Sequence, residues 1–178
     1  QSAELISPAV FEPGMTRKNK HVICWAGWAA VDVDDLKISA EDVETYLSKR
    51  FGKWSYVCYS TASSTIEQPK FRLVFRLNRQ VENAKLKHLW FALNHEMEEL
   101  GDPQTKDLAR MYYIPATYRG ANNFFFVNEG VPIDVDSLLD CHPYDDRKNS
   151  ANFLDRLPPA FRDQVIAYRR DSLDNTSY

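Results

Sequence analysis

Apolar side chains are concentrated in residues 21–33, a run of valine, isoleucine, alanine and tryptophan that Gly27 interrupts. Such a run predicts a buried strand, and the glycine either divides it into two strands or bends a single one. Residues 54–59 and 70–77 alternate in the manner of strands. In the second of these, one face is apolar and predicts a core contact, whereas the other face is basic and carries Lys70, Arg72 and Arg76.

Two segments have the apolar spacing of amphipathic helices. Ser39 is followed by acidic residues, which favour the positive end of a helix, and apolar residues then recur at helical spacing as far as Phe51. The second segment, 83–100, predicts a long helix that ends at Gly101.

Two further strands are predicted at 108–114 and 123–127, separated by a turn-like sequence at 119–122. The predicted order is therefore β-α-β-β-α-β-β. This order is typical of an α+β fold of the split βαβ kind.

The composition becomes polar between residues 140 and 152, which predicts a linker, and Leu157 with the two prolines after it opens another predicted helix. We expect a main domain over 1–139, a linker over 140–152 and a helical appendage over 153–178 that leads to a further domain. The sequence starts at Gln1 instead of methionine, which favours a processed product or a piece of a longer protein.

The chain carries a formal net charge of -3, which disfavours a protein that coats nucleic acid through overall positive charge but is compatible with a local basic groove. Its 178 residues suffice for one substantial core. Cys24, Cys58 and Cys141 are widely spaced and odd in number, so neither a disulfide framework nor a zinc ribbon is indicated. Without an apolar run of membrane-spanning length or a signal peptide, we expect a cytoplasmic protein of a prokaryote or a viral host.

Two carboxylates end the first apolar run. Asp32 and Asp34 lie two residues apart on a predicted strand, so both side chains point to the same side. Hard oxygen ligands suit Mg²⁺ or Mn²⁺, the ions that neutralise charge during phosphoryl transfer. The pattern is not specific by itself, because Asp134 and Asp136 repeat it without a comparable apolar run, in a place where they are expected to cap a turn or short helix.

A loop rich in hydroxyl groups, residues 59–65, lies between two predicted strands and precedes the basic face that starts at Lys70. Hydroxyls and backbone amides of such a loop can hold phosphate oxygens, and cations on the next strand can pair with them. An ordinary polar hairpin loop beside a solvated strand is the simpler interpretation of this segment taken alone. Residues 101–115 add Asp102 and Arg110 near a strand start, or else form only a helix end and a turn.

Together these segments resemble the archaeo-eukaryotic primase superfamily, whose primase-polymerase domains occur in replication proteins of phages, plasmids and other mobile elements. The resemblance covers about residues 20–128 and lies in the order and kind of four segments. They are Asp32-Val33-Asp34-Asp35 after an apolar strand, Tyr59-Ser60-Thr61-Ala62-Ser63-Ser64, Pro69-Lys70-Phe71-Arg72-Leu73-Val74-Phe75, and Asp102 through Arg110 with Tyr113-Ile114-Pro115.

The resemblance implies an RRM-like catalytic core that carries out template-directed nucleotidyl transfer with two Mg²⁺ or Mn²⁺ ions. It implies catalytic and metal-binding roles for Asp32, Asp34 and Asp102, with Asp107 as the alternative third acid. Contacts to the incoming nucleotide are implied for Ser60, Ala62, Ser64, Lys70, Arg72 and Arg110. The partners it implies are a single-stranded DNA template, nucleoside triphosphates and a helicase domain in the same full-length chain.

The second segment departs from the family pattern. The family usually places a histidine there that contacts the phosphates of the nucleotide, whereas this loop has Ala62 and Ser64 at the corresponding places. The chain's four histidines lie elsewhere and are interpreted as surface or core residues. Activity is therefore expected to be impaired, or triphosphate is bound through hydroxyls and arginines alone.

Two other functions stay open. One is a nucleic-acid-binding or nucleotide-binding module of a replication initiator that has lost catalysis. The other, a rolling-circle initiator nuclease, is disfavoured because it needs a paired-histidine metal site and no His-X-His sequence occurs. Most aromatic residues are expected in the core, and Tyr118 and Arg119, in a predicted loop, are the best candidates for stacking on bases.

Overall fold

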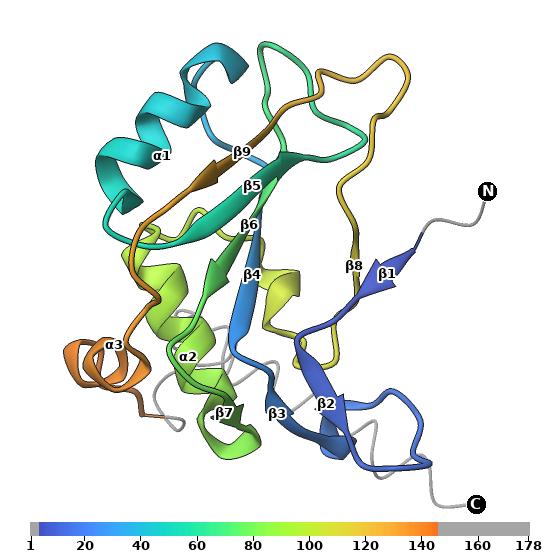
Figure 1. The fold of residues 1–178 in the computed structure, drawn as a ribbon, viewed down its shortest axis with the longest axis vertical. Helices are drawn as coiled ribbons and strands as arrows, with labels where there is room; N and C mark the ends of the chain where they lie inside the picture. The colour runs from blue at the N-terminus through green and yellow to red at the C-terminus, as the bar shows by residue number, and fades with distance from the viewer. Residues whose placement is uncertain (1–3, 146–178) are drawn as a thin grey trace, which may run out of the picture. The chain divides into compact units, whose positions relative to one another are not determined.

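Four antiparallel strands form the central sheet of this computed structural model, which describes residues 4–145 (Figure 1). Their order is β4 (Trp28–Val33), β6 (Phe71–Arg76), β5 (Tyr56–Ser60) and β9 (Phe125–Asn128). Helix α1 (Val43–Phe51) connects β4 to β5, and β6 lies between these two strands. This is a split βαβ arrangement, so the predicted α+β class is confirmed.

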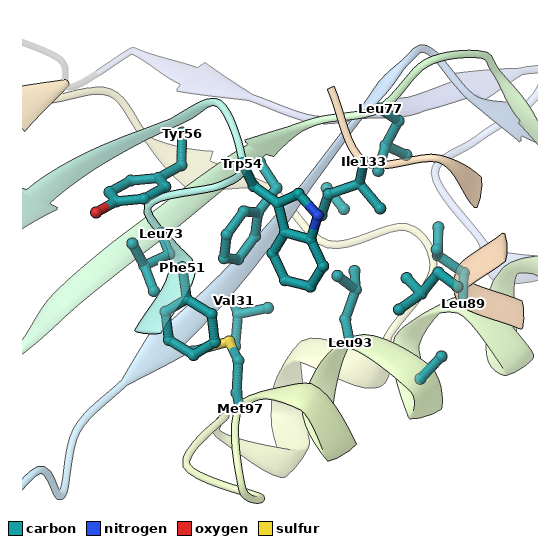
Figure 2. Close-up of a cluster of buried hydrophobic side chains, with 14 of the residues drawn as sticks. Val31, Phe51, Trp54, Tyr56, Leu73, Leu77, Leu89, Leu93, Met97 and Ile133 are labelled. Carbon is teal, nitrogen blue, oxygen red and sulfur yellow. The ribbon is translucent and has the colours of Figure 1, made fainter. Parts of the chain in front are cut away.

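One face of the central sheet forms the core, together with α1 and α2 (Asn83–Glu96). The predicted alternation in β6 is confirmed, because Phe71, Leu73 and Phe75 all point into this core and are fully buried. Figure 2 shows Leu93 of α2 and Met97, the residue that follows this helix, meeting Val31 of β4 and Phe51 of α1. Burial of this apolar surface is the main source of stability for the sheet.

Two smaller sheets accompany the central one. β2 (Ala9–Phe11), β3 (Val22–Trp25) and β7 (Val81–Glu82) form a three-stranded sheet, and β1 (Leu5–Ile6) pairs with β8 (Tyr112–Tyr113). Three of these strands, β1, β2 and β7, were not predicted from the sequence. The run 21–33 therefore contains two strands, β3 and β4. Between them Gly27 has a φ of +75°, a conformation that favours glycine.

Three short 3-10 helices and one more α-helix complete the described elements. The 3-10 helices are η1 (Asn19–His21), η2 (Ala40–Asp42) and η3 (Pro103–Lys106). Ser39 caps η2 by accepting a hydrogen bond from the backbone of Glu41, in keeping with the predicted helix start. Asp134 caps α3 (Val135–Cys141) through the amide of Ser137, so the second Asp-X-Asp sequence is a helix cap as predicted.

Two predicted elements are shorter than expected. The helix predicted over 83–100 ends at Glu96, because Glu98 and Glu99 have φ angles of +53° and +60° that no α-helix accommodates. The side-chain oxygen of Asn94 then accepts a hydrogen bond from the amide of Gly101 at 3.1 Å.

The strand predicted over 108–114 is reduced to Tyr112–Tyr113. A turn occupies its first half, closed by the amide of Arg110 donating to the carbonyl of Asp107 at 3.1 Å. Most of the predicted linker and the helix predicted after Leu157 lie outside the described residues. Within the described part of the chain, no helix has the length and apolar character needed to span a membrane.

Candidate functional site

The first acid of the predicted site, Asp32, lies near the end of β4 and points to the sheet face opposite α1 and α2, which we call the open face. Gly101 forms a bridge with Val33, and the amide of Asp102 donates to the carbonyl of Asp32 at 2.8 Å. Segments that are 70 residues apart in sequence therefore meet here. Asp34 follows β4 directly and is exposed.

Electrostatics link the three acids. Partial burial raises the pKa of Asp34, and the neighbouring carboxylates of Asp32 and Asp102 raise it further, whereas Lys70 opposes this by favouring the charged form. Three carboxylates and the cations Lys70, Arg72 and Arg110 therefore influence one another at this end of β4.

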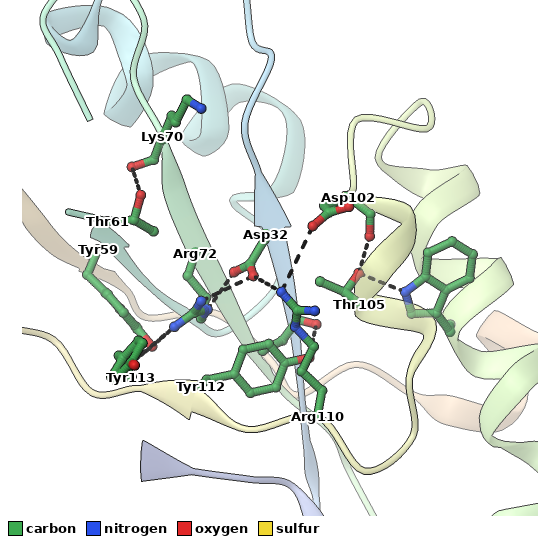
Figure 3. Close-up of polar contacts among 12 residues, drawn as sticks. Asp32, Tyr59, Thr61, Lys70, Arg72, Asp102, Thr105, Arg110, Tyr112 and Tyr113 are labelled. Atoms are coloured by element: carbon green, nitrogen blue, oxygen red, sulfur yellow. Dashed lines mark hydrogen bonds and ion pairs between the residues drawn. The ribbon is translucent and has the colours of Figure 1, made fainter. Parts of the chain in front are cut away.

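The carboxylate of Asp32 is held by Arg72, its direct cross-strand partner on β6. Arg72 donates from Nε to Oδ1 at 2.5 Å and from Nη2 to Oδ2 at 3.1 Å, and both side chains are more than nine-tenths buried (Figure 3). The guanidinium also lies 4.6 Å from the ring centroid of Tyr112 and 5.6 Å from that of Tyr59. Its Nη1 donates to the carbonyl of Tyr113 at 3.0 Å. Arg72 is thus part of the folded framework of the site rather than of a solvated basic face.

Arg110 connects the first and third acids. Its Nη2 lies 3.5 Å from Oδ2 of Asp32 and 4.0 Å from Oδ2 of Asp102. The segment that carries Asp102 is fixed by Thr105, whose hydroxyl donates to the carbonyl of Asp102 at 2.6 Å and accepts from the indole of Trp90 at 3.0 Å. These contacts position Arg110 and Asp102 beside Asp32 (Figure 3).

Asp107, the alternative third acid, has a local hydrogen bond instead. Its Oδ1 accepts from the amide of Ala109 at 3.3 Å, within the turn that precedes β8. The contacts therefore favour Asp102 as the partner of the Asp32 and Asp34 pair.

In the hydroxyl-rich loop, the two serines that were predicted to contact a nucleotide form hydrogen bonds with the protein backbone. The hydroxyl of Ser60 accepts from the amide of Phe124 at 3.0 Å, and that of Ser64 accepts from the amide of Lys70 at 3.1 Å. Both serines are buried, whereas Ala62 is exposed at the tip of the loop. Contact of Ser60 or Ser64 with a nucleotide stays a prediction.

The residue types fit a hard divalent cation, since Asp32, Asp34 and Asp102 supply the carboxylate oxygens that Mg²⁺ and Mn²⁺ prefer. As placed in residues 4–145, however, no three histidine, cysteine or acidic side chains form a set that could hold a metal ion. Both oxygens of Asp32 face arginines, although a carboxylate offers about four lone-pair positions and retains capacity for a further ligand. Closing a metal site here therefore needs a shift of Arg110, whose side chain is 27% exposed.

Several residues of the site were missed by the sequence patterns. Tyr59 and Tyr112 flank the Arg72 guanidinium, and Phe125 is 58% exposed on the open face, where a core position was expected. Tyr59 had a usable signal, because it lies on the opposite side of its strand from the core residues Tyr56 and Cys58. Phe125 had none, since its exposure depends on β9 being the edge strand.

Comparisons with known proteins agree with this architecture. The AEP domain of the primase-polymerase (PrimPol) of cyanophage S-2L has a similar fold, with a TM-score of 0.53 at 13% sequence identity over 76% of this chain and 68% of that one. The predicted resemblance to primase-polymerase domains is thereby confirmed for the fold. No curated protein sequence gives a match. A family model described as the VapE N-terminal domain matches residues 13–153, and this chain therefore belongs to the VapE N-terminal domain family.

Proposed function

We propose that this domain is a primase-polymerase that copies a single-stranded DNA template by metal-dependent nucleotidyl transfer. The observation that carries the proposal is the meeting of Asp32, Asp34 and Asp102 with Lys70 and Arg110 at one end of β4. The similar fold of the cyanophage domain supports it. The replication of a mobile element and a helicase in the same full-length chain belong to the same proposal.

In the proposed reaction, a 3′ hydroxyl attacks the α-phosphate and pyrophosphate leaves. Asp32, Asp34 and Asp102 would hold the divalent ions, which would supply positive charge to neutralise the triphosphate and the developing transition state. Lys70 and Arg110 contribute two cations at the edge of the acidic group, in positions to pair with phosphate oxygens.

Arg72 has a positioning role in this proposal. Its two hydrogen bonds fix the orientation of the Asp32 carboxylate, and the surrounding tyrosines fix Arg72 itself. A metal-ligating carboxylate that is hydrogen-bonded to a fixed side chain keeps its orientation when the charge at the site changes.

A primer-extension assay tests the proposal with the full chain, single-stranded DNA, nucleotides and Mn²⁺. Asp34→Asn is the sharpest variant, because Asp34 is exposed and its isosteric replacement should leave the fold intact. We expect extension to fall by roughly two orders of magnitude, the usual cost of losing one electrostatic contact to a transition state. Asp35→Asn is the matched control, since Asp35 is the next residue, is also exposed and pairs with Lys37 instead. Absence of extension by the parent protein, or equal activity of parent and Asp34→Asn, would overturn the proposal.

A second candidate is a nucleic-acid-binding module that has lost catalysis. Two observations favour it, namely the exposed Ala62, where the resemblance leads one to expect a histidine, and the contacts of both Asp32 carboxylate oxygens with arginines. It predicts oligonucleotide binding that is unaffected by Mn²⁺ and by Asp34→Asn. Calorimetry that detects Mn²⁺-dependent triphosphate binding, abolished by Asp34→Asn, would reject it.

A further inference from the structure

The outer half of the open face, formed by β5 and β9, exposes apolar side chains beside the candidate site. Over β4, the ring of Tyr112 covers this face, and its hydroxyl donates to the carbonyl of Ala30 at 3.3 Å. On β9, in contrast, Phe125 is 58% exposed and Val127 is 54% exposed. Phe125 and Val127 are two residues apart on one strand, so together they form an exposed apolar patch on the sheet face that carries the candidate site, and such patches mark interaction or ligand surfaces.

Next to Phe125 the surface is hollowed into a cavity of about 450 Å³. It is lined by Tyr59, Pro115, Thr117, Asn123, Phe124 and Phe125. The side chain of Asn123 binds the backbone of Tyr118 and Ala121, so the loop that borders the cavity is internally braced. The cavity is therefore an open hollow with aromatic side chains on its strand side and a braced loop on the other, a shape that accommodates a flat group such as a base.

Strand register connects this cavity to the acids. One row of cross-strand neighbours runs across the four strands. Asp32 of β4 pairs with Arg72 of β6, which pairs with Tyr59 of β5, which in turn pairs with Phe125 of β9. Neighbouring strands lie about 4.8 Å apart, so three steps separate Phe125 from Asp32 by roughly 14 Å. A nucleic-acid strand of a few nucleotides spans that distance. Tyr59 connects the cavity to the candidate site, because it lines the cavity and its hydroxyl donates to the carbonyl of Tyr113 beside Arg72.

Charge distinguishes this cavity from a second one of about 470 Å³ between α1 and β9. The second cavity is lined by two acids, Glu41 and Glu44, and one cation, Lys49, so its net negative charge disfavours phosphates. No acidic residue lines the Phe125 cavity, and Arg119 is exposed in the loop between its lining residues Thr117 and Asn123. Arg76, exposed on the same sheet face, is a further cation for a passing phosphate backbone.

We propose that the Phe125 cavity binds a base of the single-stranded DNA template by stacking on the ring of Phe125. Stacking on an aromatic ring suits a template strand because it tolerates any base sequence. This inference rests on the proposed function for the identity of the strand, and it adds the place at which the strand is held.

Binding of a fluorescent single-stranded oligonucleotide to the full chain, measured by anisotropy without metal or nucleotide, tests the inference. We expect Phe125→Ala to weaken binding by about 5- to 100-fold, as for loss of one stacked base, and Phe125→Trp to retain it. Val131→Ala is the matched control, because Val131 is another strongly exposed apolar residue outside the cavity, and it should bind as the parent does.

A second oligonucleotide of the same charge, with abasic sites in place of bases, isolates stacking from phosphate contacts. It should bind the parent more weakly than the intact strand, whereas Phe125→Ala should bind both strands alike. Because no metal is present, a persistent Phe125 effect in a protein without polymerase activity would support the cavity and reject the proposed function.

Three results would overturn the inference. The first is unchanged oligonucleotide binding by Phe125→Ala. The second is loss of triphosphate binding in place of oligonucleotide binding, which would assign the cavity to the incoming nucleotide. The third is a change in oligomeric state or unfolding free energy with unchanged oligonucleotide binding, which would show that Phe125 packs against a second copy or another segment of the chain.

Discussion

Arg72 donates two hydrogen bonds to the carboxylate of Asp32 from the directly opposed position on the neighbouring strand. Both side chains are buried, although they lie on the sheet face opposite α1 and α2. Each charge therefore depends on the other to offset the cost of removing it from water. The same carboxylate is the first acid of the proposed metal site. Fold stability and proposed chemistry therefore depend on one side chain, and substitutions must be chosen to separate the two.

Arg72→Met should lower the free energy of unfolding by about 3 kcal/mol, because it leaves the Asp32 carboxylate buried with only Arg110 as a distant partner. Urea denaturation measures the change. Arg76→Met is the matched control, four residues along the same strand and exposed, and should stay within about 0.5 kcal/mol of the parent. Equal stability of the two variants would show that the buried pair contributes little.

Asp34 should give a pH-dependent difference in stability between the parent and Asp34→Asn in metal-free buffer. Its pKa is raised in the folded state through burial and the neighbouring acids, so ionising it opposes folding above the unfolded-state value of 3.8. We expect Asp34→Asn to be the more stable protein at pH 7. The difference should shrink as the pH falls and vanish below 3.8. If the stability difference between the two proteins grew on acidification, the pKa of Asp34 would not be raised in the folded state.

Ser64→Ala should destabilise the fold by about 1 kcal/mol, since it removes the side-chain acceptor for the partly buried amide of Lys70. Ser63 is exposed in the same loop, so Ser63→Ala serves as the control and should leave stability unchanged. If Ser64→Ala instead preserves stability and weakens triphosphate binding, the hydroxyl faces the ligand and not the loop.

Ala62→His should increase affinity for a triphosphate in the presence of Mn²⁺, because the position is exposed at the loop tip and is, with Ser64, where the resemblance implies the family histidine. Calorimetry at pH 6 and pH 8 would measure it, and the gain should be larger at pH 6, where the imidazole is charged. An unchanged affinity at both values would place the loop tip away from the phosphates.

The sequence patterns were most successful where one face of an element is buried. The alternation in β6 and the spacing in α1 follow directly from packing against the core, and the capping role of Asp134 follows from local hydrogen bonding. The split βαβ arrangement could be predicted because it depends on the order of these elements.

Features set by tertiary contacts could not be predicted in this way. The end of α2 depends on the backbone of Glu98 and Glu99, and the pairing of β1 with β8 joins residues more than 100 positions apart. Arg72 occupies a polar position in the alternation, yet it is buried because β8 covers that part of the sheet. Local sequence carries no information on such coverage.

Anomalous scattering from crystals soaked with Mn²⁺ and a non-hydrolysable nucleoside triphosphate tests the central claim most directly. The account predicts manganese peaks at about 2.0–2.3 Å from carboxylate oxygens of Asp34, Asp102 and Asp32, with Arg110 displaced from the acids and directed to phosphate. Peaks remote from these three carboxylates, with the Arg110 contacts to Asp32 and Asp102 intact, would contradict it.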